Sequence, residues 1–130
     1  MVKPGKEGDL SGRWAGVYVY PDDDYPPTPF TAELVDDGGV LTGWTQEPDL
    51  LDGGPDIHAT LEGQHAGSAV VFTKFPAGGQ LHTIDYQGDV AADGRQIIGR
   101  WIIYGEWSGA FRMQRRLAPT ETALERAASA

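Results

Sequence analysis

The sequence predicts an all-β protein: a single eight-stranded antiparallel up-and-down β-barrel, followed by a short C-terminal helical tail. Three observations lead to this fold class. Apolar and polar residues alternate with period two in many short stretches, turn residues separate these stretches at regular spacing, and no helical periodicity lies between them. The short connections make sequence neighbours spatial neighbours, which favours a barrel over a sandwich.

The longest and most apolar hairpin, residues 94–113, is expected to organise the core. Ile97, Gly99, Trp101 and Ile103 share one face, and the alternation resumes after a Gly-Glu-Trp-Ser connection. This pattern predicts strands seven and eight.

Turn or loop residues bound each of the six earlier strands. Two long loops, 21–29 and 47–56, carry prolines and acidic residues that do not suit a sheet interior. A tight turn at residues 36–39 has the glycines that a hairpin turn requires. The expected strands span residues 12–20, 30–35, 40–46, 57–63, 68–75 and 80–88.

The chain of 130 residues suffices for one domain. Residues 1–11 are polar and Gly-rich and predict a flexible leader, residues 12–117 form the barrel domain, and residues 118–130 form the tail. The spacing of Thr122 and Glu125 is that of a capping box, so a frayed helix is expected in the tail.

Composition narrows the classes of function. The chain has no cysteine, which excludes disulfides and thiolate chemistry. A net charge of −9 argues against a nucleic-acid partner, because phosphate contact requires a basic surface. No apolar run has the length of a signal-peptide core or of a membrane span, so we expect no membrane partner and a cytoplasmic location.

A short motif at the start of the first strand resembles a known group of barrels. Gly12-Arg13-Trp14, together with Arg115 near the end of the last strand, is similar to the opening of calycins, the group of lipocalins, fatty-acid-binding proteins and avidins. The resemblance implies a barrel whose closed end has the Trp covered by the Arg. The opening also resembles the Gly-x-Trp-x-Gly of nitrobindin-like haem barrels. No histidine follows His82 to ligate a haem in the C-terminal strands, and no cofactor is expected.

The two long loops and the turn with Trp107 are odd-numbered connections, so an up-and-down barrel places all three at one open end. Loops on a rigid scaffold commonly carry binding residues. The leading hypothesis is a non-catalytic barrel that binds a small apolar or aromatic ligand, or a partner, at this end. The expected ligand-binding residues are Tyr18, Tyr20, Phe30, His82, Ile84, Ile103 and Trp107.

Two other readings stay open. A barrel-type enzyme of the cyclase or isomerase kind would use Tyr18, Tyr20 and His82, although no catalytic motif is present and no catalytic residue is assigned. Alternatively, aromatic side chains fill the barrel, and the protein is a structural or interaction domain.

No metal site is assigned from the sequence. Strand directions keep His58, His65 and His82 from converging on one metal. The acidic loops lack the spacing of an EF-hand, and whether they bind Ca²⁺ is left open.

The outer face of strands one, seven and eight carries an apolar strip, which predicts a covering partner. The tail beyond Leu117 has Leu124 as its one large aliphatic residue, too little to bury the strip. We therefore expect a homo-oligomer formed through this face. The strip comprises Val17, Val19, Ile98, Ile102 and Tyr104.

Overall fold

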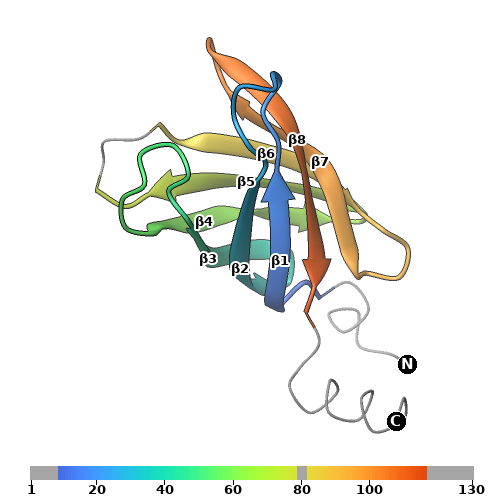
Figure 1. Ribbon diagram of the computed structural model, residues 1–130. Coiled ribbons are helices and arrows are strands. Elements are labelled where there is room, and N and C mark those ends of the chain that lie inside the picture. Colours follow the sequence, from blue (N-terminus) through green and yellow to red (C-terminus); the bar gives the residue numbers. More distant parts are fainter. Residues whose placement is uncertain (1–8, 79–81, 117–130) are drawn as a thin grey trace, which may run out of the picture.

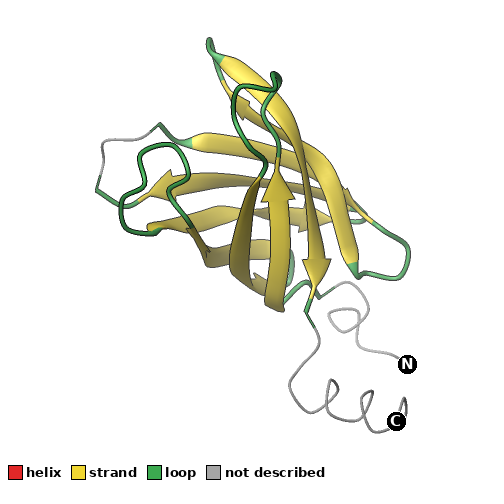
Figure 2. Ribbon diagram, in the orientation of Figure 1, coloured by secondary structure: helices red, strands yellow, loops and turns green. Residues whose placement is uncertain are grey.

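The computed structural model describes residues 9–78 and 82–116, and these form one closed barrel of eight antiparallel strands (Figure 1). The described part of the chain contains strands, turns and loops (Figure 2). Within it, no helix has the length and apolar character needed to cross a membrane. The predicted tail helix lies outside the described residues. The strands are β1 Gly12–Tyr18, β2 Thr28–Asp37, β3 Val40–Glu47, β4 Ile57–Ala66, β5 Ala69–Pro76, β6 Ile84–Val90, β7 Gln96–Ile103 and β8 Trp107–Arg115.

The strands pair in sequence order, and β8 returns to pair with β1, which confirms the predicted up-and-down barrel. In the closing pair Trp14 lies opposite Arg115, and Tyr18 lies opposite Phe111. The predicted inward face is also confirmed, since Trp14 and Ile97 have no exposed surface. Period-two alternation was therefore sufficient to assign the faces of these strands.

Several strand boundaries differ from the predicted ones. β4 continues to Ala66, because the β4–β5 turn needs only two residues and Gly67 adopts a positive φ of 60° there. His65 consequently lies within the strand and not in the turn. β6 begins at Ile84, opposite Lys74, so His82 precedes the strand instead of lying inside it.

Trp101 is held in the core by a close approach between β7 and β8. Its side chain is 3% exposed, and its indole Nε1 donates a hydrogen bond to Val19 O at 2.8 Å. A Cβ at Gly109, the residue opposite Trp101 on β8, would lie 2.6 Å from that Nε1. Only glycine leaves room for the indole at this position.

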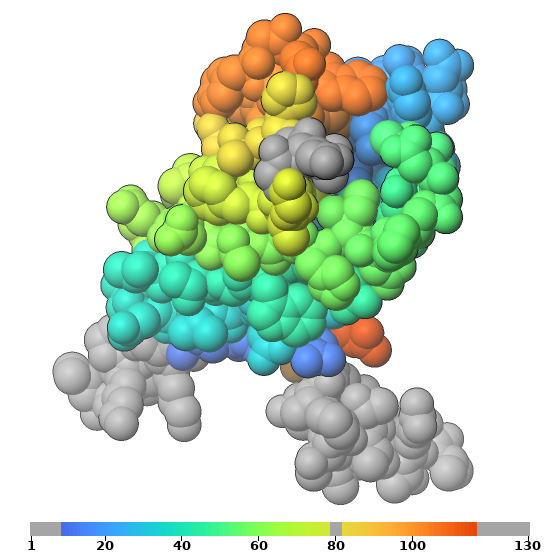
Figure 3. All heavy atoms as spheres, turned by 90° about the vertical axis from the view of Figure 1, so that its left-hand side faces the viewer, coloured from blue at the N-terminus to red at the C-terminus, as the bar shows by residue number. Residues whose placement is uncertain are grey.

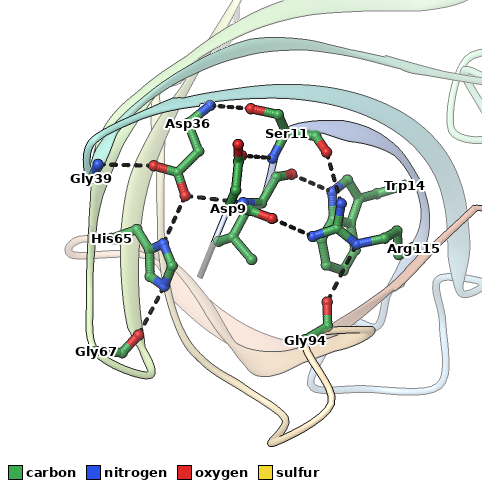
Figure 4. A network of polar contacts seen from close by, with 10 residues as sticks. Asp9, Ser11, Trp14, Asp36, Gly39, His65, Gly67, Gly94 and Arg115 are labelled. Atoms are coloured by element: carbon green, nitrogen blue, oxygen red, sulfur yellow. Dashed lines mark hydrogen bonds and ion pairs between the residues drawn. The ribbon is translucent and has the colours of Figure 1, made fainter. Parts of the chain in front are cut away.

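The closed end of the barrel is sealed by the residues that precede β1 (Figure 4). The Arg115 guanidinium lies 4.8 Å from the centre of the Trp14 ring and donates hydrogen bonds to the carbonyl oxygens of Asp9 and Ser11, each at 2.7 Å. The Trp14 indole donates to Leu10 O at 2.9 Å, and Leu10 is 1% exposed. The last residues of the expected leader are thus packed against the barrel.

A second polar cluster at the closed end centres on Asp36 (Figure 4). One carboxylate oxygen lies 2.8 Å from His65 Nδ1 and accepts a hydrogen bond from Leu10 N, while the other accepts from Gly39 N. The other ring nitrogen of His65 lies 2.8 Å from Gly67 O. Burial raises the pKa of Asp36, but the hydrogen bonds from His65 and from the two backbone amides outweigh it and leave the pKa below its ordinary value.

The register shows how the expected apolar strip lies on the outer face. β8 lies between β1 and β7, and Arg112 sits opposite Val17 on one side and opposite Ile98 on the other. Ser108 lies opposite Ile102 in the same way. Polar side chains of β8 therefore separate the strip residues of β1 from those of β7.

Candidate functional site

The end of the barrel opposite Arg115 is open. The β1–β2, β3–β4 and β7–β8 connections surround this end, as the blue, green and orange atoms of Figure 3 show. Together with Pro76 at the end of β5 and Ala77, Gly78 and His82 between β5 and β6, they surround an open cavity of about 780 Å³ that reaches into the barrel. The side chains of residues 9–78 and 82–116 leave this part of the interior open.

The cavity brings together six of the seven residues expected to bind a ligand. That these residues bind a ligand stays a prediction. The six that line the cavity are Tyr18, Tyr20, His82, Ile84, Ile103 and Trp107.

Phe30 is the seventh, and the structure places it in the core and not on the cavity wall. It is 8% exposed and its ring covers Gly16, where an added Cβ would lie 2.2 Å from a ring carbon. The Phe30 and Tyr18 ring centres are 6.1 Å apart. Phe30 thus packs beside Tyr18 without reaching the cavity.

One wall of the cavity is a cluster of aromatic rings. Tyr20 packs against Trp101 and Trp107, with ring centres 5.7 and 5.1 Å apart. Tyr25, from the β1–β2 loop, packs against both Trp107 and Tyr20, with ring centres 5.4 and 5.1 Å away. These contacts fix the loop and the rings relative to each other, which gives a ligand a wall that is already formed.

The inner end of the cavity contains a buried ion pair that the sequence analysis did not identify. Lys74 Nζ lies 2.5 Å from Glu47 Oε1, and the two side chains are 5% and 3% exposed. The Tyr18 hydroxyl donates a hydrogen bond to the other oxygen of Glu47. Lys74 Nζ also lies 5.1 Å from the centre of the Tyr18 ring and 5.9 Å from that of Tyr86.

These four groups determine the charge at the inner end. Burial lowers the pKa of Lys74, but the facing Tyr86 and Glu47 outweigh it, and the net pKa lies above the ordinary value. Burial also raises the pKa of the Tyr18 phenol, and the neighbouring Glu47 carboxylate adds to the shift. Burial raises the pKa of Tyr86 as well. Lys74 is therefore a cation and both phenols are neutral at neutral pH.

The alternation of inward and outward side chains along β5 and β3 indicates that both charged residues point into the barrel. Lys74 follows Val70 and Phe72 on the inward side of β5, where a cation needs a partner. Glu47 follows Leu41 and Thr45 on the inward side of β3. The inward position of Glu47 was not predicted, because the strand was expected to end at residue 46 and Glu47 was assigned to the acidic loop.

The mouth of the cavity differs from its inner end in exposure and charge. The His82 side chain is 71% exposed and lies 3.4 Å from Glu106, which is 50% exposed. Asp49 and Asp52, from the β3–β4 connection, also line the cavity. The Tyr18 hydroxyl, in contrast, donates its hydrogen bond to Glu47 at the inner end.

No three His, Cys, Asp or Glu side chains of residues 9–78 and 82–116 gather closely enough to hold a metal ion. His58 points outward from β4, His65 lies at the closed end, and His82 lies at the mouth. The three histidines are thus distributed over separate parts of the barrel.

The fold and the site define the class: a small, closed, eight-stranded antiparallel β-barrel with one sealed end and one open cavity, which is consistent with a calycin-like barrel. No protein-family model matches the chain, and no curated protein matches it by sequence.

Proposed function

We propose that this barrel binds a small, predominantly apolar or aromatic molecule in the open cavity. The observation that carries the proposal is a preformed cavity of about 780 Å³ whose walls are mainly aromatic and aliphatic side chains. Cavities of roughly 300–1,000 Å³ with such walls are typical of small-molecule sites. Trp101, Trp107 and Ile103 are among the lining residues.

Binding without catalysis fits this geometry better than an enzyme. Glu47 accepts hydrogen bonds from both Lys74 and Tyr18, and is therefore committed to structural partners. His82 lies in the exposed mouth, away from this pair. A general base must reach the proton that it removes, and no free base of the described residues lies at the inner end of the cavity.

The experiment is a calorimetric titration with acetylnaphthalene, a neutral two-ring probe that this cavity can enclose. We expect saturable binding with one site per chain and a raised Tm, because a ligand that binds only the native state stabilises it. Absence of heat and of a Tm shift at probe concentrations up to its solubility would refute the proposal.

A matched pair of variants locates the site. Ile84→Trp adds volume inside the cavity and should abolish probe binding, since Ile84 lines it. Val71→Trp adds the same side chain on the outer face, where Val71 is 47% exposed, and should leave binding unchanged. Equal affinity in the two variants would place the probe elsewhere.

A further inference from the structure

Resting on the proposed function, we infer that Lys74 is the polar anchor of the cavity, and that the ligand presents an uncharged oxygen acceptor, such as a carbonyl or hydroxyl oxygen, to the Lys74 ammonium. The ligand class is thus a neutral ring compound that carries one such oxygen at its inner end.

Lys74 has more hydrogen-bond donors than its described partners use. An ammonium has three N–H donors. Among the described residues, Glu47 is the acceptor at hydrogen-bond distance, and the Tyr86 phenol also faces the ammonium. Even with both as acceptors, one donor remains for a ligand, and Lys74 lines the cavity.

Glu47 already has a partner on each carboxylate oxygen, Lys74 on one and the Tyr18 hydroxyl on the other. A donor group of a ligand would have to share one of these oxygens with the bond already made there. The N–H of Lys74 that remains without an acceptor among the described residues favours a ligand that carries an acceptor.

The charges around the cavity favour an uncharged acceptor. Four acidic residues line the cavity, and Lys74 is the one Lys or Arg among its described lining residues. Its charge is already balanced by Glu47 at 2.5 Å. An anionic ligand would add a second negative charge beside Glu47 and pass the acidic mouth, so the cavity disfavours it. The acidic lining residues are Glu47, Asp49, Asp52 and Glu106.

The test compares three naphthalenes of nearly the same shape by calorimetry at neutral pH: isopropylnaphthalene, acetylnaphthalene and naphthoate. They differ in presenting a hydrocarbon, a neutral carbonyl or a carboxylate at one position. A hydrogen bond to a charged donor should make acetylnaphthalene bind at least about tenfold more tightly than isopropylnaphthalene. Naphthoate should bind more weakly than acetylnaphthalene.

The double variant Glu47→Gln/Lys74→Met removes the ammonium and its counter-charge together, which buried pairs often tolerate. In this variant the preference for acetylnaphthalene over isopropylnaphthalene should fall below about twofold. The wild-type comparison alone still decides the inference if this variant does not fold.

The outcomes separate the two proposals. Equal wild-type affinity for acetylnaphthalene and isopropylnaphthalene would overturn the role of Lys74 and leave the binding function standing. Tightest binding of naphthoate would show an anion site and also overturn the inference. No binding of any of the three would contradict the proposed function itself.

Discussion

Glu47 Oε1 and Lys74 Nζ lie 2.5 Å apart inside the barrel, although 27 residues separate them in the chain. Both side chains are removed from water, so each charge depends on the other. The Tyr18 hydroxyl completes the group by donating to Glu47. The pair joins β3 to β5 across β4 at the inner end of the cavity, and its removal has measurable consequences for stability.

Glu47→Gln should destabilise the protein strongly, because it leaves the Lys74 ammonium buried without a counter-charge. Loss of one partner of a buried pair costs about 3–5 kcal/mol. Replacing both residues, as Glu47→Gln/Lys74→Met, should restore part of that loss. Urea denaturation measures the free energy of unfolding of all three proteins. A double variant less stable than the single variant would contradict this account.

The protein should lose stability in alkaline solution. The ordinary pKa values of Tyr and Lys are 10.0 and 10.5, and the folded protein raises those of Tyr18, Tyr86 and Lys74. The native state then retains protons that the unfolded state releases, so the stabilisation is complete below about pH 10 and declines as pH rises through the folded pKa values. Tm should fall between about pH 9 and about pH 11. Tyr18→Phe should make this fall shallower, and an unchanged wild-type Tm would contradict the assignment.

Trp101→Ala should destabilise the barrel by about 3–5 kcal/mol, because it empties a buried aromatic site and leaves Val19 O without its donor. Trp44 provides the control, since it points outward from β3 and is 37% exposed. Arg13 lies over its ring at 5.6 Å, an exposed contact worth about 1 kcal/mol or less. Equal Tm losses in the two alanine variants would show that the inward face of β7 is misassigned.

Asp36 should stabilise the closed end above its ordinary pKa of 3.8 and lose that effect in acid. Its folded pKa is lowered, so the stabilisation is present at neutral pH and disappears as pH falls through the folded value. Asp36→Asn should therefore be less stable than wild type at pH 7 and show a weaker acid dependence. The exposed neighbour Asp37 supplies the control variant Asp37→Asn. Urea midpoints measured across the acid range distinguish the Asp36→Asn variant from the Asp37→Asn variant.

Association through the outer face of β1, β7 and β8 stays a prediction. Arg112 separates Val17 from Ile98 there, and its aliphatic stem would become part of the contact. Light scattering should give at least twice the chain mass of 14.0 kDa. Ile102→Lys should reduce that mass without unfolding the barrel, whereas Val71→Lys, on the exposed face of β5, should leave the mass unchanged. A wild-type mass of 14.0 kDa would exclude this association.

Local patterns were enough to predict the barrel and its two ends. Period-two alternation gave the inward face of β7 with Trp101, and the tight turns gave the order of the strands. The contact of Trp14 with Arg115 at the closed end was implied by the resemblance to calycins, and the structure shows it. The barrel and its two ends depend on residues close together in sequence or on strand order alone.

Alternation along a strand tells whether a residue points into or out of the barrel, but not how deep in the barrel it lies. Phe30 and Tyr18 both point inward, yet the β1–β2 register places Phe30 opposite Gly16 in the core and Tyr18 at the cavity. The same limitation applied to the outer strip, whose division by Arg112 depends on the pairing of β8 with both of its neighbours.

The sequence by itself thus determined the number and order of the strands, the faces of their central residues and which end of the barrel carries the long loops. The tertiary structure alone decided that Glu47 and Lys74 meet, and that Tyr18 completes their group. The physical reason is that alternation is a property of each strand, whereas the attraction between two charges depends on their separation and on the exclusion of water. Both quantities are set only when β3, β4 and β5 pair and the barrel closes around the pair.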